Sequence, residues 1–401
     1  MRTRSPLVAT VITPLLVACI ALTLGGCAAN HRPKTTIAAL RSDAERLRVV
    51  DRATRDSVIE RLVRRARARG DNSLDMLMLS GGGQNGAFGV GFLRGWSTRT
   101  DAPMPKFDLV TGVSTGSLQA PYALLGTPAA LDTVTALYRR AAERIAPTID
   151  WLFWLRRTGG VVNTERFDRT LEASISGEFR TELRRAFAED RQLLFATSDY
   201  DLGVGRVWSL GDALDTSAAG LTRARTLLKA ATAIPGIFPP VVVDGHLHGD
   251  GGVTANTLVA LQYEDYQRLA RRLADAGMRN VTIRVYALMN IWSYPPLQVT
   301  PASNRKKISA RAEGMLLFNH QPETLQNQAN LARAVSSTIP GLTMDLKVAD
   351  LPASLSMEPG AAKLFDKAFM RRLEEVGTAK ARSANPWDTI PSAYARPPGD
   401  R

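Results

Sequence analysis

Cysteine and histidine are scarce in this chain of 401 residues, which contains only two cysteines and four histidines. Both cysteines, Cys19 and Cys27, lie near the N-terminus, so no disulfide can hold the remainder of the chain together. No group of Cys and His residues has the spacing of metal ligands, and no internal repeat is visible. The sequence therefore argues against a disulfide-stabilised domain, a metal site and a repeat architecture, and we expect no cofactor.

The N-terminus lacks the long, uninterrupted apolar run of a membrane span. A short basic segment, Met1-Arg-Thr-Arg-Ser-Pro6, precedes an apolar stretch from Leu7 to Leu24 that Pro14 interrupts. This order is typical of a secretion signal. The stretch ends in Leu24-Gly-Gly-Cys27, which resembles the lipobox of bacterial lipoproteins, where the signal is cleaved before a cysteine that carries the lipid.

We therefore expect residues 1–26 to be a lipoprotein signal peptide and Cys27 to be the lipidated residue. The earlier Leu16-Val-Ala-Cys19 also fits the pattern, but cleavage there would leave an apolar stub ahead of the polar linker. Ala28, next to Cys27, resembles the outer-membrane sorting signal of Gram-negative cells. These features predict a protein of the bacterial cell envelope that is lipid-anchored at the outer membrane and faces the periplasm.

Basic residues outnumber acidic residues by 51 to 38, which gives a formal net charge of +13. A basic surface suits anionic phospholipid headgroups, and on charge alone it would suit nucleic acid equally well. Because secretion argues against nucleic acid, we expect a lipid or membrane partner and no nucleic-acid partner.

Part of the positive charge lies in residues 27–72, a predicted linker followed by a basic amphipathic helix. Arginines cluster between Arg41 and Arg69, while Leu47, Val58 and Leu62 fall near helical spacing. This helix could lie on a membrane surface or pack against the flank of the following domain, and the sequence leaves both interpretations open.

A glycine cluster directly follows the first predicted strand. The mostly apolar run Leu74-Asp-Met-Leu-Met-Leu79 is typical of a buried parallel strand, and it ends at Gly81, Gly82 and Gly83. The next segment, Gly86–Trp96, is predicted to be a helix whose small residues let it lie close to the sheet. Free N–H groups at its start would stabilise a developing negative charge. A phosphate-binding loop is the rival interpretation, but no Gly-Lys-Ser/Thr follows and the glycine spacing differs from that of a dinucleotide-binding loop.

A second strand and turn present a serine. The apolar run that begins at Phe107 leads into Gly112-Val-Ser-Thr-Gly116, where the two glycines relieve crowding around a sharp strand-to-helix turn. This turn would place Ser114 Oγ at the carboxyl end of the sheet, where ligands bind in open α/β folds. An anion-stabilising glycine loop beside a serine nucleophile is the minimal equipment for acyl transfer.

A serine nucleophile needs a base, and the candidates are few. Asp250 lies between glycines in His248-Gly-Asp-Gly-Gly252 and could accept the Ser114 proton directly, as a two-residue dyad. In a Ser–Asp–His triad, only His320 would follow Asp250, since His246 and His248 precede it. A third possibility is that Asp250 belongs to a structural turn and has no catalytic role. The residues alone leave these alternatives open.

Four motifs together resemble one known family, the patatin-like phospholipases. They are Gly81-Gly-Gly-Gln-Asn-Gly86, Gly112-Val-Ser-Thr-Gly116, Ala233-Ile-Pro-Gly-Ile-Phe-Pro-Pro240 and Asp250-Gly-Gly252, in matching order and spacing. The resemblance spans about Leu74 to Leu288 and continues more weakly to about Glu375. It implies a three-layer α/β/α fold with a central, mostly parallel sheet and a serine nucleophile elbow.

The same resemblance implies hydrolysis of lipid esters by a Ser–Asp dyad without histidine. By motif match, Ser114 would be the nucleophile and Asp250 the base. The backbone amides of Gly82 and Gly83, with help from Gly81 and Thr115, would form the oxyanion hole.

We therefore divide the chain into a signal peptide (1–26), a linker and basic helix (27–72), an acyl hydrolase domain (73–375) and a loosely ordered tail (376–401). The expected activity is that of a serine lipid acyl hydrolase of phospholipase A or lysophospholipase type. One alternative is a small-ester or thioester hydrolase with the same mechanism. Another is a catalytically idle, lipid-binding scaffold protein of the envelope, although the intact Ser114, Asp250 and glycine cluster argue against it.

Overall fold

The computed structural model describes residues 32, 34–144, 148–150, 158–316, 321–363 and 365–392. The predicted signal peptide, the predicted lipidation site Cys27 and the candidate base His320 lie outside the described residues. Ser114, Asp250 and the glycine cluster lie inside them.

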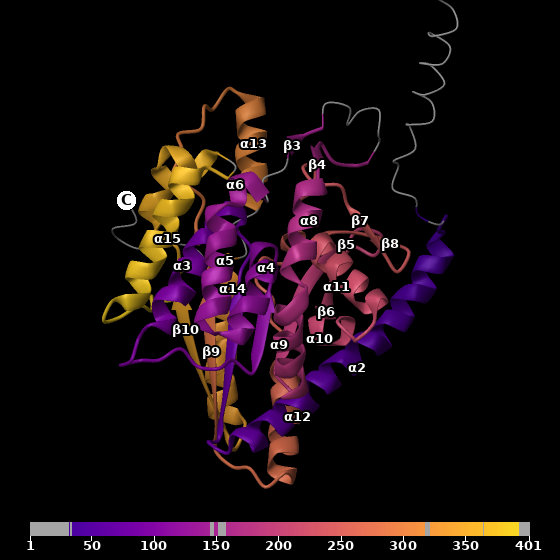
Figure 1. Ribbon diagram of the computed structural model, residues 1–401, viewed down its shortest axis with the longest axis vertical. Helices are drawn as coiled ribbons and strands as arrows, with labels where there is room; N and C mark the ends of the chain where they lie inside the picture. The colour runs from indigo at the N-terminus through magenta and orange to yellow at the C-terminus, as the bar shows by residue number, and fades with distance from the viewer. Residues whose placement is uncertain are drawn as a thin grey trace, which may run out of the picture.

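The strands are listed here in chain order: β1 (Ser73–Leu79), β2 (Leu109–Gly112), β3 (Thr148–Ile149), β4 (Val162–Asn163), β5 (Gln192–Asp199), β6 (Val204–Ser209), β7 (Val241–Val243), β8 (His246–Asp250), β9 (Val281–Leu288) and β10 (Leu342–Ala349). Eight of them form a central sheet in the order β10-β9-β1-β2-β5-β8-β7, with β6 paired to β5 outside this path (Figure 1). The run from β10 to β5 is parallel, whereas β6, β7 and β8 are antiparallel to their neighbours. β3 and β4 form a separate small pair.

The α-helices are α2 (Ile37–Arg69), α3 (Gly86–Ser97), α4 (Thr115–Leu125), α5 (Pro128–Arg139), α6 (Ala141–Arg144), α8 (Glu165–Ser174), α9 (Gly177–Ala188), α10 (Leu210–Ala213), α11 (Ala218–Ala231), α12 (Tyr263–Asp275), α13 (Arg305–Leu316), α14 (Gln321–Thr338) and α15 (Lys367–Arg382). Short 3₁₀ helices include η1 (Gly83–Asn85) and η2 (Gly251–Val253). The parallel strands point their carboxyl ends toward the top of Figure 1, where α13 lies.

Helices cover both faces of the sheet, because successive residues of a strand point to opposite faces. In β1, Leu77 and Leu79 belong to a core shared with α3, α4, α5 and α15. The alternate residues Leu74, Met76 and Met78 belong to a second core shared with α2, α12 and α14. The three layers and the mostly parallel sheet confirm the predicted fold class.

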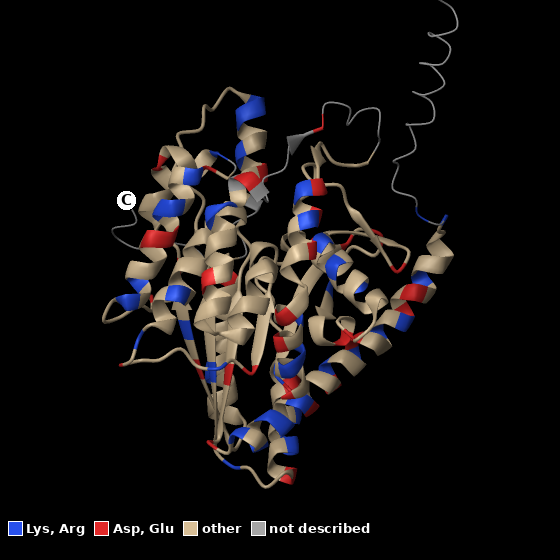
Figure 2. Cartoon of the chain, viewed as in Figure 1, with Lys and Arg blue, Asp and Glu red and all other residues tan. Residues whose placement is uncertain are grey.

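The second half of α2 packs against the flank of the domain. Val58, Leu62 and Ala66 are buried in the core that α12 also lines. Arginines lie among Asp and Glu in the first part of this helix and stand without acids near its end (Figure 2), and Arg64 pairs with Asp190 of the domain at 2.7 Å. The sequence had left membrane contact and packing on the domain open, and this half of the helix is packed.

The C-terminal helix extends past the predicted end of the domain. Gly377 of α15 lies so close to α3 that a Cβ there would approach the Phe88 carbonyl oxygen to 2.1 Å. Gly91 of α3 is equally close to the Glu374 carbonyl of α15, so the glycines of α3 serve helix–helix contact and not only the predicted approach to the sheet. A domain boundary at Glu375 therefore falls within a packed helix.

The chain beyond α15 also contributes to the core. The Trp387 ring lies 5.1 Å from that of Trp96 and 5.4 Å from that of Tyr286, centroid to centroid. The predicted loose tail, 376–401, is thus packed at least as far as this tryptophan. The polar composition of the segment gave no sign of this packing, and the neighbouring Asp388 N–H also donates to the Val348 carbonyl oxygen of β10 at 2.7 Å. Within the part of the chain that the structure describes, no helix is both long and apolar enough to cross a bilayer.

Candidate active site

Ser114 occupies a sharp turn between β2 and α4. Its backbone has φ 51° and ψ −123°, a left-handed conformation that costs a non-glycine residue about 1–3 kcal/mol. The flanking glycines make the turn possible. A Cβ on Gly112 would lie 2.6 Å from the Gly116 carbonyl oxygen, and a Cβ on Gly116 would lie 2.3 Å from that of Leu79. The turn therefore has the geometry of the predicted nucleophile elbow.

Asp250 ends β8, whose antiparallel pairing with β5 sets Asp250 opposite Thr197. Its carboxylate Oδ1 accepts a hydrogen bond from the Gly252 N–H at 2.8 Å. The other oxygen, Oδ2, is buried and has no partner that meets the geometry of a hydrogen bond. Burial raises the pKa of this carboxyl to about 6, and the Ser114 hydroxyl and the Gly252 amide oppose a larger rise. Asp250 can therefore accept a proton near neutral pH.

Ser114 and Asp250 are brought together although their strands are not neighbours in the sequence. The Ser114 hydroxyl is close enough to lower the pKa of the Asp250 carboxyl, but the contact lacks the geometry of a complete hydrogen bond. Catalytic hydrogen bonds are often long before substrate binds. Both residues are nearly buried, with exposed fractions of 8% and 5%.

The glycine loop lies directly against the serine. A Cβ built on Gly81 would come within 3.2 Å of the Ser114 Cβ. The Gly81 N–H donates to the Asn256 carbonyl oxygen at 3.0 Å, which removes it from the amides available to an oxyanion. The N–H groups of Gly82, Gly83 and Thr115 donate no backbone hydrogen bond within the described residues. These three amides are therefore the available donors.

The two described histidines belong to a different network. His246 Nδ1 lies 2.7 Å from the Asp199 carboxylate, and its Nε2 lies 3.2 Å from that of Asp43 in α2. His248 Nδ1 lies 2.9 Å from the Thr197 hydroxyl, and burial lowers the pKa of this imidazole to about 4. Among the described contacts, neither imidazole bonds to Ser114 or Asp250.

A small apolar cavity, the outer cavity, opens beside Ser114. Its volume is about 50 Å³. Besides Ser114, it is lined by Gly83, Thr115, Leu118, Tyr138, Ala141, Phe167, Thr232, Ile234, Phe238 and Phe365. Apart from the amides and hydroxyls near Ser114, these groups offer hydrocarbon to a ligand. The site therefore combines a nucleophile, a base and amide donors with an apolar binding space.

Two residues that support this site were not assigned a role from the sequence. Tyr138 hydrogen-bonds through its hydroxyl to the Thr115 side chain at the start of α4. Asn256 holds Gly81 through both its backbone carbonyl and its side-chain amide. Asn256 follows the Asp250 motif closely enough to be suspected from the sequence, whereas nothing local marks Tyr138.

The geometry agrees with a comparison against protein families. Residues 77–261 match the family described as Patatin-like phospholipase. The chain contains a patatin-like phospholipase domain. The resemblance seen in the four motifs is thereby confirmed, and it supports lipid hydrolysis at the level of the family.

Other comparisons add little to the patatin-like assignment. Among solved structures, VipD from Legionella pneumophila matches at 13% sequence identity, covering 76% of this chain and 67% of that chain, with a TM-score of 0.29. At that TM-score the match carries no argument about this chain. No curated protein matches the sequence.

The patatin-like segment contains Ser114, Asp250 and the three glycines of the loop. Within the described residues, no group of three or more His, Cys, Asp or Glu side chains is placed to hold a metal ion. The placement of Ser114 beside Asp250 is suited to nucleophilic attack by a serine whose proton a carboxylate accepts.

Proposed function

We propose that this protein is a serine acyl hydrolase of phospholipase A or lysophospholipase type, with Ser114 as nucleophile and Asp250 as base. The observation that carries the proposal is the strained backbone of Ser114 against a buried carboxylate. Such strain persists only where the surrounding structure enforces it, and it is concentrated at functional sites.

In the first half-reaction, Asp250 accepts the Ser114 proton while Oγ forms a bond to the acyl carbonyl carbon. The N–H groups of Gly82 and Gly83 stabilise the oxyanion, in a site that little water reaches. Breaking of the ester C–O bond then expels the alcohol, which takes the proton from Asp250. This leaves a Ser114 acyl ester.

Water completes the cycle. Asp250 accepts a proton from the water as its oxygen bonds to the acyl carbon, and the same amides hold the second oxyanion. When the bond between Ser114 Oγ and the acyl carbon breaks, Oγ regains the proton and the fatty acid leaves. A base whose pKa is about 6 suits this role, because it is ionised at neutral pH yet basic enough to take the proton.

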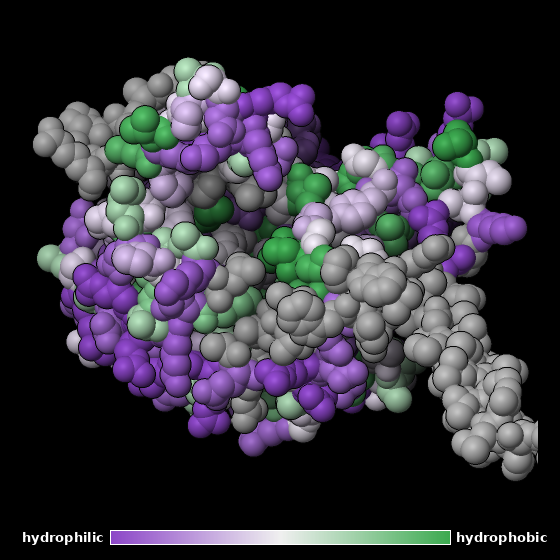
Figure 3. Space-filling view, turned by 90° about the horizontal axis from the view of Figure 1, so that it is seen from above, coloured by the Kyte–Doolittle hydropathy of each residue, from purple (hydrophilic) through white to green (hydrophobic). Residues whose placement is uncertain are grey.

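The apolar lining of the outer cavity supports an acyl chain as the group that lies beside Ser114. A small-ester or thioester hydrolase with the same mechanism is the alternative within this chemistry. Lipid binding without catalysis would not require the strained backbone conformation of Ser114. Seen from above, apolar side chains gather near the middle of the face toward which the parallel strands point (Figure 3), which suits a lipid substrate.

The cellular location is proposed from the sequence. Cleavage before Cys27 and its lipidation would anchor the protein in the bacterial envelope, at the outer membrane and facing the periplasm. The test is expression of the full chain and of Cys27→Ser in a Gram-negative host. A full chain that stays in the soluble fraction would contradict the anchor.

The activity is tested with the full chain in detergent on a panel of phospholipids, lysophospholipids and short-chain esters. Release of fatty acid from the lipids supports the proposal. Turnover of short esters alone would favour the small-ester alternative. Failure to hydrolyse any of them, together with failure to react with a fluorophosphonate, would favour the idle lipid-binding protein.

A further inference from the structure

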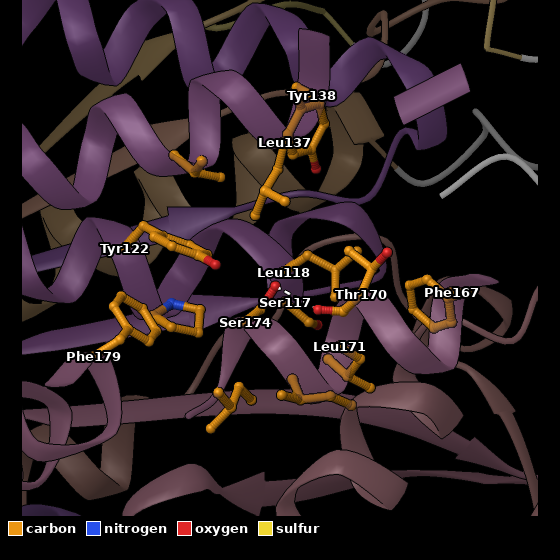
Figure 4. Close-up of a pocket in the computed structure, with 14 residues that line it drawn as sticks. Ser117, Leu118, Tyr122, Leu137, Tyr138, Phe167, Thr170, Leu171, Ser174 and Phe179 are labelled. Atoms are coloured by element: carbon orange, nitrogen blue, oxygen red, sulfur yellow. Dashed lines mark hydrogen bonds between the residues drawn. The ribbon is translucent and has the colours of Figure 1, made fainter. Parts of the chain in front are cut away.

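A second apolar cavity, the inner cavity, lies next to the outer one. Its volume is about 40 Å³, and its walls come from α4, α5, α8, α9 and α11 (Figure 4). Leu171 and Leu228 line the inner cavity and not the outer one. No step of the proposed reaction uses this space, and its hydrocarbon walls would bind an apolar ligand.

Leu118, Tyr138 and Phe167 line both cavities. These three side chains are therefore the wall between the space at Ser114 and the space beyond. Rotation of side chains such as Leu118 or Phe167 would join the two cavities without moving a helix, because rotamer changes are small motions compared with backbone shifts.

The inner cavity follows one face of α4. Ser114 precedes the first turn of this helix, and Leu118 and Tyr122 follow at four-residue intervals, so all three share a face. The eight residue steps from Ser114 to Tyr122 correspond to roughly 12 Å at 1.5 Å per residue. An extended hydrocarbon chain advances ~1.3 Å per carbon, given C–C bonds of about 1.5 Å. About nine carbons therefore span this distance.

Two aromatic rings close the far end. Tyr122 and Phe179 lie side by side with ring centroids 4.6 Å apart, and Figure 4 shows them at the opposite end of the cavity from Phe167. Tyr122 is buried, while Phe179 is half-buried and separates the cavity from the surface. An acyl chain that extends along α4 from Ser114 would reach these two rings at its far end.

We infer that the inner cavity binds the methyl end of the substrate's acyl chain and that Tyr122 and Phe179 limit its length to about eight to ten carbons. The inference rests on the proposed function, since it assumes that the carbonyl lies at Ser114. It adds the chemical class of the preferred acyl group, a medium-length chain.

The test measures kcat/KM of the full chain on nitrophenyl esters of butyric, decanoic and palmitic acid. Leu171→Phe fills the inner cavity, so the decanoate should lose about tenfold or more relative to the butyrate, which does not reach that space. Phe179→Ala opens the far end, so the palmitate should gain by a similar factor relative to the decanoate. Phe187→Ala is the matched control, because it removes a half-buried phenylalanine from the same helix but away from both cavities.

Equal losses on butyrate and decanoate in Leu171→Phe would overturn the inference, as would identical chain-length profiles for Phe179→Ala and Phe187→Ala. Either result leaves the proposed function standing, because the butyrate is still hydrolysed through Ser114. If the unaltered protein hydrolyses none of the esters and Ser114 does not react with a fluorophosphonate, the proposed function and this inference fall together. Since overpacking can destabilise a core, Leu171→Phe is used only if its thermal unfolding midpoint stays near that of the unaltered protein.

Discussion

The backbone of Gly81 is hydrogen-bonded to that of Asn256, with the Gly81 N–H donating to the Asn256 carbonyl oxygen at 3.0 Å. The Asn256 side-chain Nδ2 also donates to the Gly81 carbonyl oxygen at 3.4 Å. These bonds join the loop that carries the oxyanion amides to the segment that follows Asp250. These bonds thereby fix the relative positions of two parts of the site that are far apart in the sequence.

Asn256→Ala should therefore lower kcat by about tenfold with little change in KM, because it loosens the loop without removing a group that touches substrate. The split between kcat and KM distinguishes positioning from binding. Asn256→Asp isolates the hydrogen bond, since it keeps the shape of the side chain but cannot donate to the Gly81 carbonyl oxygen. It should therefore lose about as much kcat as Asn256→Ala. An unchanged kcat in both variants would show that Asn256 does not position the loop.

Ser114→Ala should abolish hydrolysis and fluorophosphonate labelling while leaving the fold intact. One nearly buried hydroxyl contributes little to stability, and the alanine retains the same strained backbone. Ester release and labelling are measured together with circular dichroism. Labelling that persists in the folded variant would require another nucleophile.

Arg69→Met should destabilise the protein by about 1–3 kcal/mol, because two buried carboxylates each lose one charged partner while each keeps a second arginine. Arg69 pairs with Asp75 at 2.8 Å and with Asp108 at 2.6 Å, and both carboxylates are fully buried. Arg67→Met is the matched control, since Arg67 is exposed on the same helix. The difference in the free energy of unfolding, measured by urea denaturation, checks this prediction. Equal stability of the two variants would mean that the end of α2 is not part of the folded domain.

The sequence predicted the strands and turns of the site because their determinants are local. The apolar run before Gly81 and the glycines around Ser114 each act within a few residues, and the structure has a strand at the first and a nucleophile elbow at the second. The bond that occupies the Gly81 amide depends on Asn256, far along the chain, and no local pattern announces it. For the same reason the packing of Trp387 against Trp96 was missed.

The pH dependence of hydrolysis should reflect Asp250. Burial raises the pKa of its carboxyl to about 6, and a base must be ionised to accept the serine proton. Rising pH therefore increases kcat/KM through about pH 6 to a plateau above about pH 7, whereas below pH 6 the rate falls about tenfold per unit. A profile that stays flat down to about pH 4 would indicate an ordinary carboxyl or a different base.

The dyad is separated from a triad by comparing Asp250→Asn with changes to the histidines. Loss of a general base costs on the order of 10² to 10⁴ in rate, so Asp250→Asn should be nearly as damaging as Ser114→Ala. His246→Gln and His248→Gln should each keep activity within about tenfold, because their imidazoles bond to Asp199 and Thr197 and reach the site only through packing. His248 carries the greater risk, since it precedes Asp250 by two residues on β8 and bonds to Thr197, which pairs with Asp250.

His320→Gln completes the comparison, since this histidine alone follows Asp250 in the order of a Ser–Asp–His triad. If the dyad is correct, its loss should also stay within about tenfold. Steady-state kinetics on one ester, with circular dichroism to verify folding, ranks all the variants on a single scale. A folded histidine variant as inactive as Asp250→Asn would overturn the dyad and make that histidine the base. A folded Asp250→Asn that keeps most of its activity would remove Asp250 from the mechanism altogether.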